Sequence, residues 1–290
     1  MGRLFWILVT ALVAACGPPP HHYRVDRSAL VPVPVPDVAS GPPGDSPEIT
    51  ISHSTVLWAR APEESPGSNV GLYVPRQQPG WMVRWRPRPA KPGALALDLR
   101  AGCEMGLESR SFRVVDNGME SPGPALVYWG GWAFSQRFEN GAHWSWSTDV
   151  MISDIESRVR LTCLDCAGPG DDVTDGRIRE GIAGARSQVA LGVRMSALEV
   201  ALIGAFRNQP YNVGTRDEAL TDDEAARSTL TSGDVFPIAG AALGIHPHPR
   251  VALAGTVFWP FDVQGRSVRY GPIVGASLTV RAPKKKKKEE

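Results

Sequence analysis

Apolar and polar residues alternate with a period of two in many short stretches between residues 49 and 281. In residues 81–86 (WMVRWR) the tryptophans and the valine fall on one face, and the arginines fall on the other. In residues 94–100 (ALALDLR) the leucines share one face and the charged side chains lie opposite. Such alternation is typical of strands with one apolar and one polar face. Ten strands are predicted, at about 49–60, 81–86, 94–100, 124–136, 143–152, 188–194, 198–207, 237–245, 251–257 and 268–281.

The connections between these strands alternate in length along the chain. Long ones are expected at 61–79, 102–123, 154–186 and 208–235, and a medium one at 260–267. The connections between them are tight, such as RFENG at 137–141 and HPHP at 246–249. Short turns at one end and long loops at the other are how outer-membrane β-barrels are laid out. The sequence therefore predicts an all-β fold, an antiparallel up-and-down barrel of about ten strands that resembles a small outer-membrane β-barrel.

A soluble β-sandwich remains the alternative fold, because it shows the same alternation with the two faces exchanged. The polar face here carries glycine, alanine and serine with a few charged residues, which is typical of a narrow lumen. Opposite charges on this face can pair across the lumen and predict a filled barrel rather than a pore. The candidates are Asp98, Asp149, Glu199, Arg84, Arg194 and Arg269. The ending RAPKKKKKEE departs from the aromatic residue on which such barrels usually end.

Aromatic residues gather toward the two ends of the predicted strands and are candidates for membrane-interface girdles. Trp81, Phe206, Trp259 and Tyr270 lie toward the long loops. Trp85 and Trp144 lie toward the short turns. The barrel exterior is thus expected to contact membrane lipid.

The first residues indicate export. Arg3 precedes an uncharged apolar run, and the run ends in small residues before Cys16, which predicts a signal peptide over residues 1–15. The sequence Val13-Ala14-Ala15-Cys16 resembles the lipobox of bacterial lipoproteins. That resemblance implies cleavage before Cys16 and a diacylglycerol on its thiol, and Gly17 implies an outer-membrane address. An ordinary export signal cut after Ala15 is the alternative.

Residues 16–47 are proline-rich and are predicted to form an extended linker that carries the lipid anchor. The barrel is expected over 48–282 and a charged tail over 283–290. In this layout both ends of the chain lie on the periplasmic side. The lipid on Cys16 would then lie in the inner leaflet of the outer membrane.

Three further cysteines fit an oxidising compartment. Closing Cys103 to Cys163 or Cys166 would join two predicted long loops and stabilise the fold by about 4 kcal/mol, against about 2 for the short Cys163–Cys166 loop. We therefore expect a loop-to-loop disulfide. No metal site is expected, because three thiols without a nearby histidine make an incomplete ligand set.

The charges nearly cancel, with 31 basic and 30 acidic residues, which argues against nucleic acid as a partner. None of the histidines falls in a predicted long loop, so no general base is found there and an enzyme is not expected. The histidines are His21, His22, His53, His143, His246 and His248. No cofactor is predicted. The expected function is an outer-membrane lipoprotein with a structural or partner-binding role through its loops. A tethered β-domain binding glycan or protein, and an envelope enzyme, are the alternatives.

Overall fold

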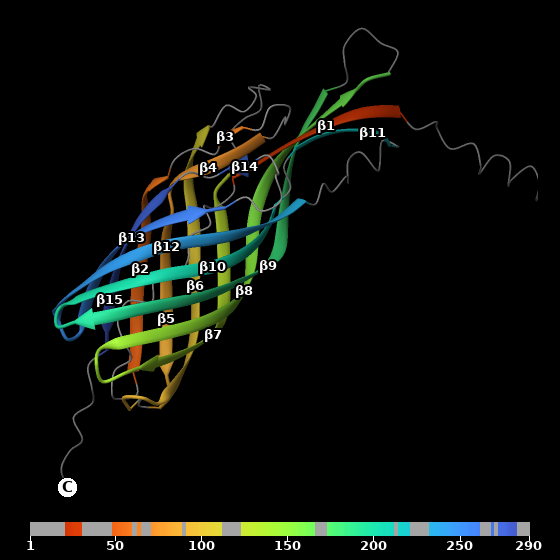
Figure 1. Cartoon of the computed structure of the whole chain (residues 1–290). Coiled ribbons are helices and arrows are strands. Elements are labelled where there is room, and N and C mark those ends of the chain that lie inside the picture. The colour runs from red at the N-terminus through yellow and green to blue at the C-terminus, as the bar shows by residue number, and fades with distance from the viewer. Residues whose placement is uncertain are drawn as a thin grey trace, which may run out of the picture.

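The computed structural model describes residues 21–30, 48–59, 63–64, 71–88, 91–111, 123–165, 173–211, 214–220, 232–261, 268–269 and 272–282. Ten antiparallel strands of this part close into a barrel, with additional strands at one end (Figure 1). The predicted fold is confirmed, and the soluble sandwich is excluded because the sheet closes on itself. In the described part of the chain, no helix is long and apolar enough to cross a membrane.

Each barrel strand pairs with its neighbours in chain order, and the first strand, β2, pairs with the last, β15, to close the ring. The barrel strands are β2 (Glu48–Ala59), β5 (Pro79–Arg86), β6 (Leu95–Ser111), β7 (Ala125–Arg137), β8 (Ala142–Cys163), β9 (Val173–Met195), β10 (Leu198–Tyr211), β12 (Ser232–His248), β13 (Val251–Pro260) and β15 (Ile273–Arg281). The short connections 87–94, 138–141, 196–197 and 249–250 lie together at one end, called here the turn end. The other end is the loop end.

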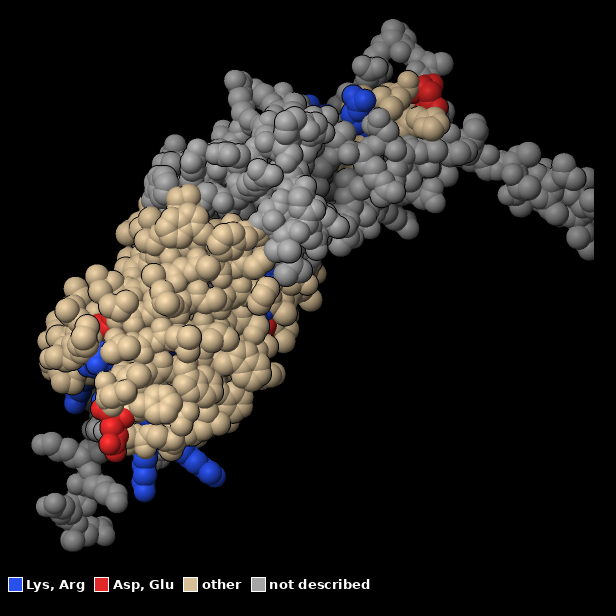
Figure 2. All heavy atoms as spheres, in the orientation of Figure 1, with Lys and Arg blue, Asp and Glu red and all other residues tan. Residues whose placement is uncertain are grey.

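The two faces of the strands differ as the alternation predicts. Leucines point outward and are 42% exposed at Leu97, 64% at Leu202 and 46% at Leu253, whereas Asp98 and Glu199 point inward and are buried. The visible barrel wall is almost free of charged side chains, which gather toward its ends (Figure 2). Because an apolar exterior around a polar interior is stable only in lipid, the chain is an outer-membrane type of barrel.

The predicted girdle residues mostly lie on the outer wall. Trp81, Trp85, Phe206 and Trp259 are between 44% and 60% exposed, and Trp144 is partly exposed. Tyr270 lies outside the described residues. Their role at the membrane interface stays a prediction.

Strands β6, β8 and β9 run much farther than predicted. The expected long connection 154–186 is mostly strand, because β8 continues to Cys163 and β9 already begins at Val173. Inward and outward side chains continue to alternate beyond Ile152. There the inward residues Ile155 and Val159 are apolar and buried, and the outward residues are charged. This pattern is expected where the outer wall leaves the lipid and meets water. The hairpin β8–β9 therefore projects past the membrane at the loop end.

Part of the predicted linker is also a strand. Residues 21–30 form β1, which pairs antiparallel with the outer part of β8 from Ser157 to Cys163. Its other edge pairs with β11 (Gly214–Leu220) and, at Ser28–Leu30, with β4 (Gly71–Gln77). Beyond Asp154, β8 no longer pairs with β7, and β1 covers the edge that would otherwise be open. The expectation that this segment is an unfolded linker is thus wrong for residues 21–30.

A separate pair of short strands, β3 (Glu63–Glu64) and β14 (Val268–Arg269), completes the described structure. The signal peptide, Cys16 and the tail 283–290 lie outside the described residues. Their predicted roles stay predictions.

The predicted disulfide from Cys103 is wrong, because Cys103 carries a free thiol. It lies in β6, which continues to Ser111 where we expected a loop, and faces Tyr128 of β7 in the same row as Ile152 of β8. Cys163 lies farther along β8 by roughly 35 Å at about 3.3 Å per residue. Cys163 is disulfide-bonded, and Cys166 lies outside the described residues.

Candidate functional site

A layer of paired charges crosses the middle of the barrel interior. Asp149 of β8 accepts hydrogen bonds from Arg100 of β6 at 2.8 and 2.6 Å, and from Arg186 of β9 at 2.9 Å. All three residues are buried, and Asp149 is 0% exposed. A buried charge is tolerated only when it is paired. The carboxylate of Asp149 therefore allows the two arginines, from β6 and β9, to stay buried in the lumen.

Glu104 of β6 extends the layer toward the loop end. Its carboxylate accepts hydrogen bonds from Arg186 at 3.3 Å and from Arg207 of β10 at 3.1 and 3.2 Å. Gln78 donates to the same carboxylate at 3.2 Å. The chain of contacts Arg100–Asp149–Arg186–Glu104–Arg207, called here the charge layer, thus joins four strands.

Trp129 lies inside the charge layer rather than in the lipid. Its ring faces the guanidinium of Arg186, 4.6 Å from the ring centroid, and that of Arg100 at 5.6 Å. It packs with buried Met82, Val127 and Met151. Its place depends on Gly102 directly opposite on β6, because a side chain there would collide with the indole.

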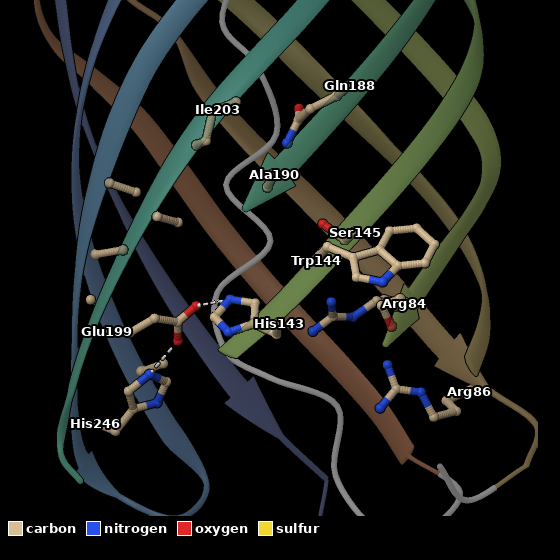
Figure 3. A pocket seen from close by; sticks show the side chains of 16 residues that line it. Arg84, Arg86, His143, Trp144, Ser145, Gln188, Ala190, Glu199, Ile203 and His246 are labelled. Carbon is tan, nitrogen blue, oxygen red and sulfur yellow. Dashed lines mark hydrogen bonds and ion pairs between the residues drawn. The ribbon is translucent and has the colours of Figure 1, made fainter. Parts of the chain in front are cut away.

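A second group of polar residues lies nearer the turn end, in a chamber of the lumen. His143 is the second residue of β8, Glu199 is the second residue of β10 and His246 lies near the end of β12, so the short turns bring the three together. Nε2 of His143 is 3.2 Å from one carboxylate oxygen of Glu199, and Nε2 of His246 is 2.8 Å from the other (Figure 3). The three side chains are at most 9% exposed. We call this group the His–Glu–His cluster.

The chamber around this cluster has a basic wall on the opposite side, where Arg84 and Arg86 of β5 are seen (Figure 3). Arg86 forms a two-pronged ion pair with Asp98, at 2.6 Å for both contacts. Arg84 donates to the hydroxyl of Thr50 at 3.2 Å. The remaining lining is mainly small side chains, Ser135, Ser145, Ala190, Ala201, Ala242, Ala252 and Ala254 among them. The chamber is thus polar at its turn end.

Gly192 makes room for the cluster. It lies directly opposite His143 on β9, and a side chain there would collide with the imidazole.

The His–Glu–His cluster has groups that can exchange protons. A carboxylate hydrogen-bonded to two imidazoles can take up or release protons, as general acid–base catalysis requires. Within the described residues, no group of three His, Cys, Asp or Glu side chains is placed to hold a metal ion.

The structure brings some of the predicted interior charges together. Asp98, Asp149 and Glu199 all lie in the lumen and are paired. Arg84 lies in the chamber wall, and Arg194 donates to the backbone oxygen of Ser196 at 3.1 Å. The side chain of Arg269 lies outside the described part.

Of the charge layer, the predicted interior charges include only Asp149; Arg100 and Arg207 were placed on polar strand faces, whereas Glu104 and Arg186 were not placed on strands. Both fell in stretches that we assigned to long loops. A signal was present in residues 102–106 (GCEMG), where Gly102, Glu104 and Gly106 continue the inward positions of Asp98 and Arg100.

No protein-family model matches the chain, and no characterised protein matches it in sequence. Several solved structures share its layout. The outer-membrane protease OmpT from Escherichia coli is 10% identical over 90% of this chain and 95% of its own, with a TM-score of 0.35. LpxR from Salmonella typhimurium is 10% identical over 80% and 99%, with a TM-score of 0.34. The P. putida toluene transporter TodX is 10% identical over 82% and 89%, with a TM-score of 0.32.

The prediction that the chain is not an enzyme is wrong, because an enzyme is not excluded. The solved structures that it resembles at this low similarity include an outer-membrane protease. The prediction rested on the absence of histidines from the predicted long loops, and it did not consider histidines on the strands. The strands instead bring His143 and His246 against Glu199 inside the lumen.

Proposed function

We propose that this protein is a sealed outer-membrane barrel that presents a β-sheet extension on its loop side to a protein or glycan partner. The observation that carries the proposal is the projecting hairpin β8–β9, which runs past the apolar belt and is widened by β1 and β11. A hairpin of this length is not needed to cross a bilayer, because about 9–11 residues per strand suffice.

The outer face of the extension suits an aqueous partner. It carries charges of both signs, and Arg179 of β9 forms an exposed two-pronged pair with Asp154 of β8, including a contact of 2.7 Å. Arg158 and Arg177 lie directly opposite each other on the same face. Such a surface is unsuited to lipid and fits a polar protein or glycan.

The sealed lumen supports a role other than an open channel. The charge layer and the buried side chains around Trp129 occupy much of the middle of the barrel. We expect the full chain in planar lipid bilayers to show no steady conductance. The variant Asp149→Ala, which loosens the layer, should show more frequent openings, whereas Asp154→Ala should behave as the wild type. A large steady conductance of the wild type would contradict the proposal and favour transport.

Partner binding has its own test. A photo-reactive side chain at Arg179 should give discrete cross-linked products in intact cells, and the same group at lipid-facing Leu202 should not. Absence of any product specific to Arg179 would contradict a partner at the extension.

Lipid attachment at Cys16 belongs to this proposal and rests on the sequence Val13–Cys16. A palmitate analogue fed to the cells should label the wild type and lose that label in Cys16→Ala. Cys103→Ala, which removes a thiol in the barrel wall, should keep the label. Equal labelling of wild type and Cys16→Ala would show that the protein is not a lipoprotein.

A further inference from the structure

The described chain begins at the loop end. His22 lies beside the outer tip of β8, where its backbone oxygen accepts a hydrogen bond from the Leu164 amide at 2.7 Å. Its own amide donates to Asp165 at 3.0 Å. β1 then runs back along β8 toward the membrane, with Ala29 opposite Ser157. The N-terminal strand is therefore fixed on the side of the projecting hairpin.

The barrel begins at the opposite end. Glu48, the first residue of β2, pairs with Arg86 beside a short connection. Its carboxylate lies 3.1 Å from Arg281 at the end of β15, and the backbone oxygen of Ile49 accepts a hydrogen bond from Ala282 at 2.9 Å. The chain between β1 and β2 thus starts at the loop end and finishes at the turn end.

The length of residues 31–47 allows one direct crossing. The strand distance from Ser157 to Ala142 of β8 is about 50 Å at about 3.3 Å per residue, or roughly 38 Å along the axis of a barrel with strands tilted by about 40°. Residues 31–47 span about 50–60 Å when extended. Their prolines, in VPVPVP at 31–36 and at 42–43 and 47, favour an extended course.

The bilayer closes the route outside the barrel. Backbone that is not in a helix or a closed barrel leaves its polar groups unsatisfied in lipid, and these prolines lack the amides of a strand. The barrel ring is also already closed between β2 and β15, so no place is left for another strand. The lumen is the remaining path.

The lumen offers a wall of small side chains for this path. Ser52 and Ser54 of β2, Thr256 of β13 and Ser277 of β15 line a pocket beside the charge layer. Ala252 and Ala254 of β13 and Ala201 of β10 continue the lining into the chamber at the turn end. The charge layer is built from β6, β8, β9 and β10, and so lies mainly on the other side of the interior.

We propose that residues 31–47 cross the outer membrane through the lumen of their own barrel, so that β1 and the N-terminus of the mature chain stand on the cell surface. A lipid on Cys16, five residues before β1, then belongs to the surface side rather than to the inner leaflet. The proposal is independent of whether the extension binds a partner.

The first experiment places β1 in intact cells. A single cysteine is introduced at His22, and the cells are treated with a maleimide that does not cross the outer membrane, with the unchanged chain as the blank. Arg179→Cys at the loop end should label, because this side chain is exposed, and Asn140→Cys at a short turn should label only after permeabilisation. We expect His22→Cys to behave as Arg179→Cys. Labelling of His22→Cys only after permeabilisation would overturn the proposal.

The second experiment tests the path. A small diazirine side chain at Val35 of the full chain is activated by light in cells, and the linked peptides are identified by mass spectrometry. Linkage to inward residues, such as Ala201 or Ser277, supports the lumen. Linkage only to outward residues or lipid, or none, overturns it. The same group at outward Leu202 is the matched control and should link to lipid. Faster migration of unboiled samples confirms that the variants are folded.

Discussion

Asp149 shows at the scale of a residue how the lumen tolerates charge. It is fully buried, yet it holds Arg100 and Arg186, and Arg186 in turn reaches Glu104. Removing one partner from such a group leaves the others buried without compensation. A substitution at Asp149 is therefore expected to lower the free energy of unfolding more than a substitution at an exposed ion pair.

Asp149→Ala should lower the free energy of unfolding by about 3–5 kcal/mol, because two buried guanidinium groups lose their carboxylate. Urea unfolding in lipid vesicles, followed by tryptophan fluorescence, measures the change. The control Asp154→Ala removes the carboxylate that pairs with Arg179, which is 68% exposed, and should have little effect. Equal unfolding midpoints for the two variants would contradict the importance of the charge layer.

The outer and inner faces should respond differently to the same new charge. Leu253 points to lipid, and Leu253→Arg should cost about 2–4 kcal/mol of unfolding free energy at the bilayer midplane. Ser277→Arg should cost less, because Ser277 lines a pocket that also contains the carboxylate of Glu104. The same urea titration compares them, and a larger cost at Ser277 would mean that the lumen has no room for the side chain.

At the scale of strands, β1 closes an edge that the barrel leaves open. Val25 is fully buried and lies between Leu161 of β8 and Arg216 of β11 in the ladders. The barrel strands do not need β1 for their own pairing. We therefore expect β1 to be removable without loss of the barrel.

Val25→Pro should release β1, because proline removes an amide from the ladder. Hydrogen exchange of the backbone amides at 158–162 should become faster, while the amides at 146–152 stay protected. Val25→Ala keeps the amide and serves as the control. Unchanged exchange at 158–162 in Val25→Pro would show that β1 does not protect this edge.

The strands were predictable where lipid and lumen act on alternate residues, as in residues 94–100 and 251–257. Their ends were not, because past Ile152 the outer wall meets water and polar residues follow on both β8 and β9. β1 was hidden among prolines, and its partners are far away in the sequence. The His–Glu–His cluster depends on which turns are neighbours, which alternation does not reveal.

At the scale of the whole molecule, the closed and internally paired barrel should resist detergent. The full chain is expected to migrate faster on an unboiled gel than after boiling, because the folded barrel is compact and binds less detergent. The boiled half of the same sample is the control. Identical migration would indicate that no barrel persists in detergent.

The pairing of β2 with β15 also has a consequence for biosynthesis. The barrel strand synthesised first, β2, must wait for the one synthesised last, since its partner β15 begins only at Ile273. A chain cut short before that point keeps two unpaired edges that no other part of the barrel can satisfy, and such edges favour aggregation and proteolysis. Prematurely terminated copies should therefore be degraded in the periplasm rather than accumulate in the membrane, so that only full-length chains are retained there.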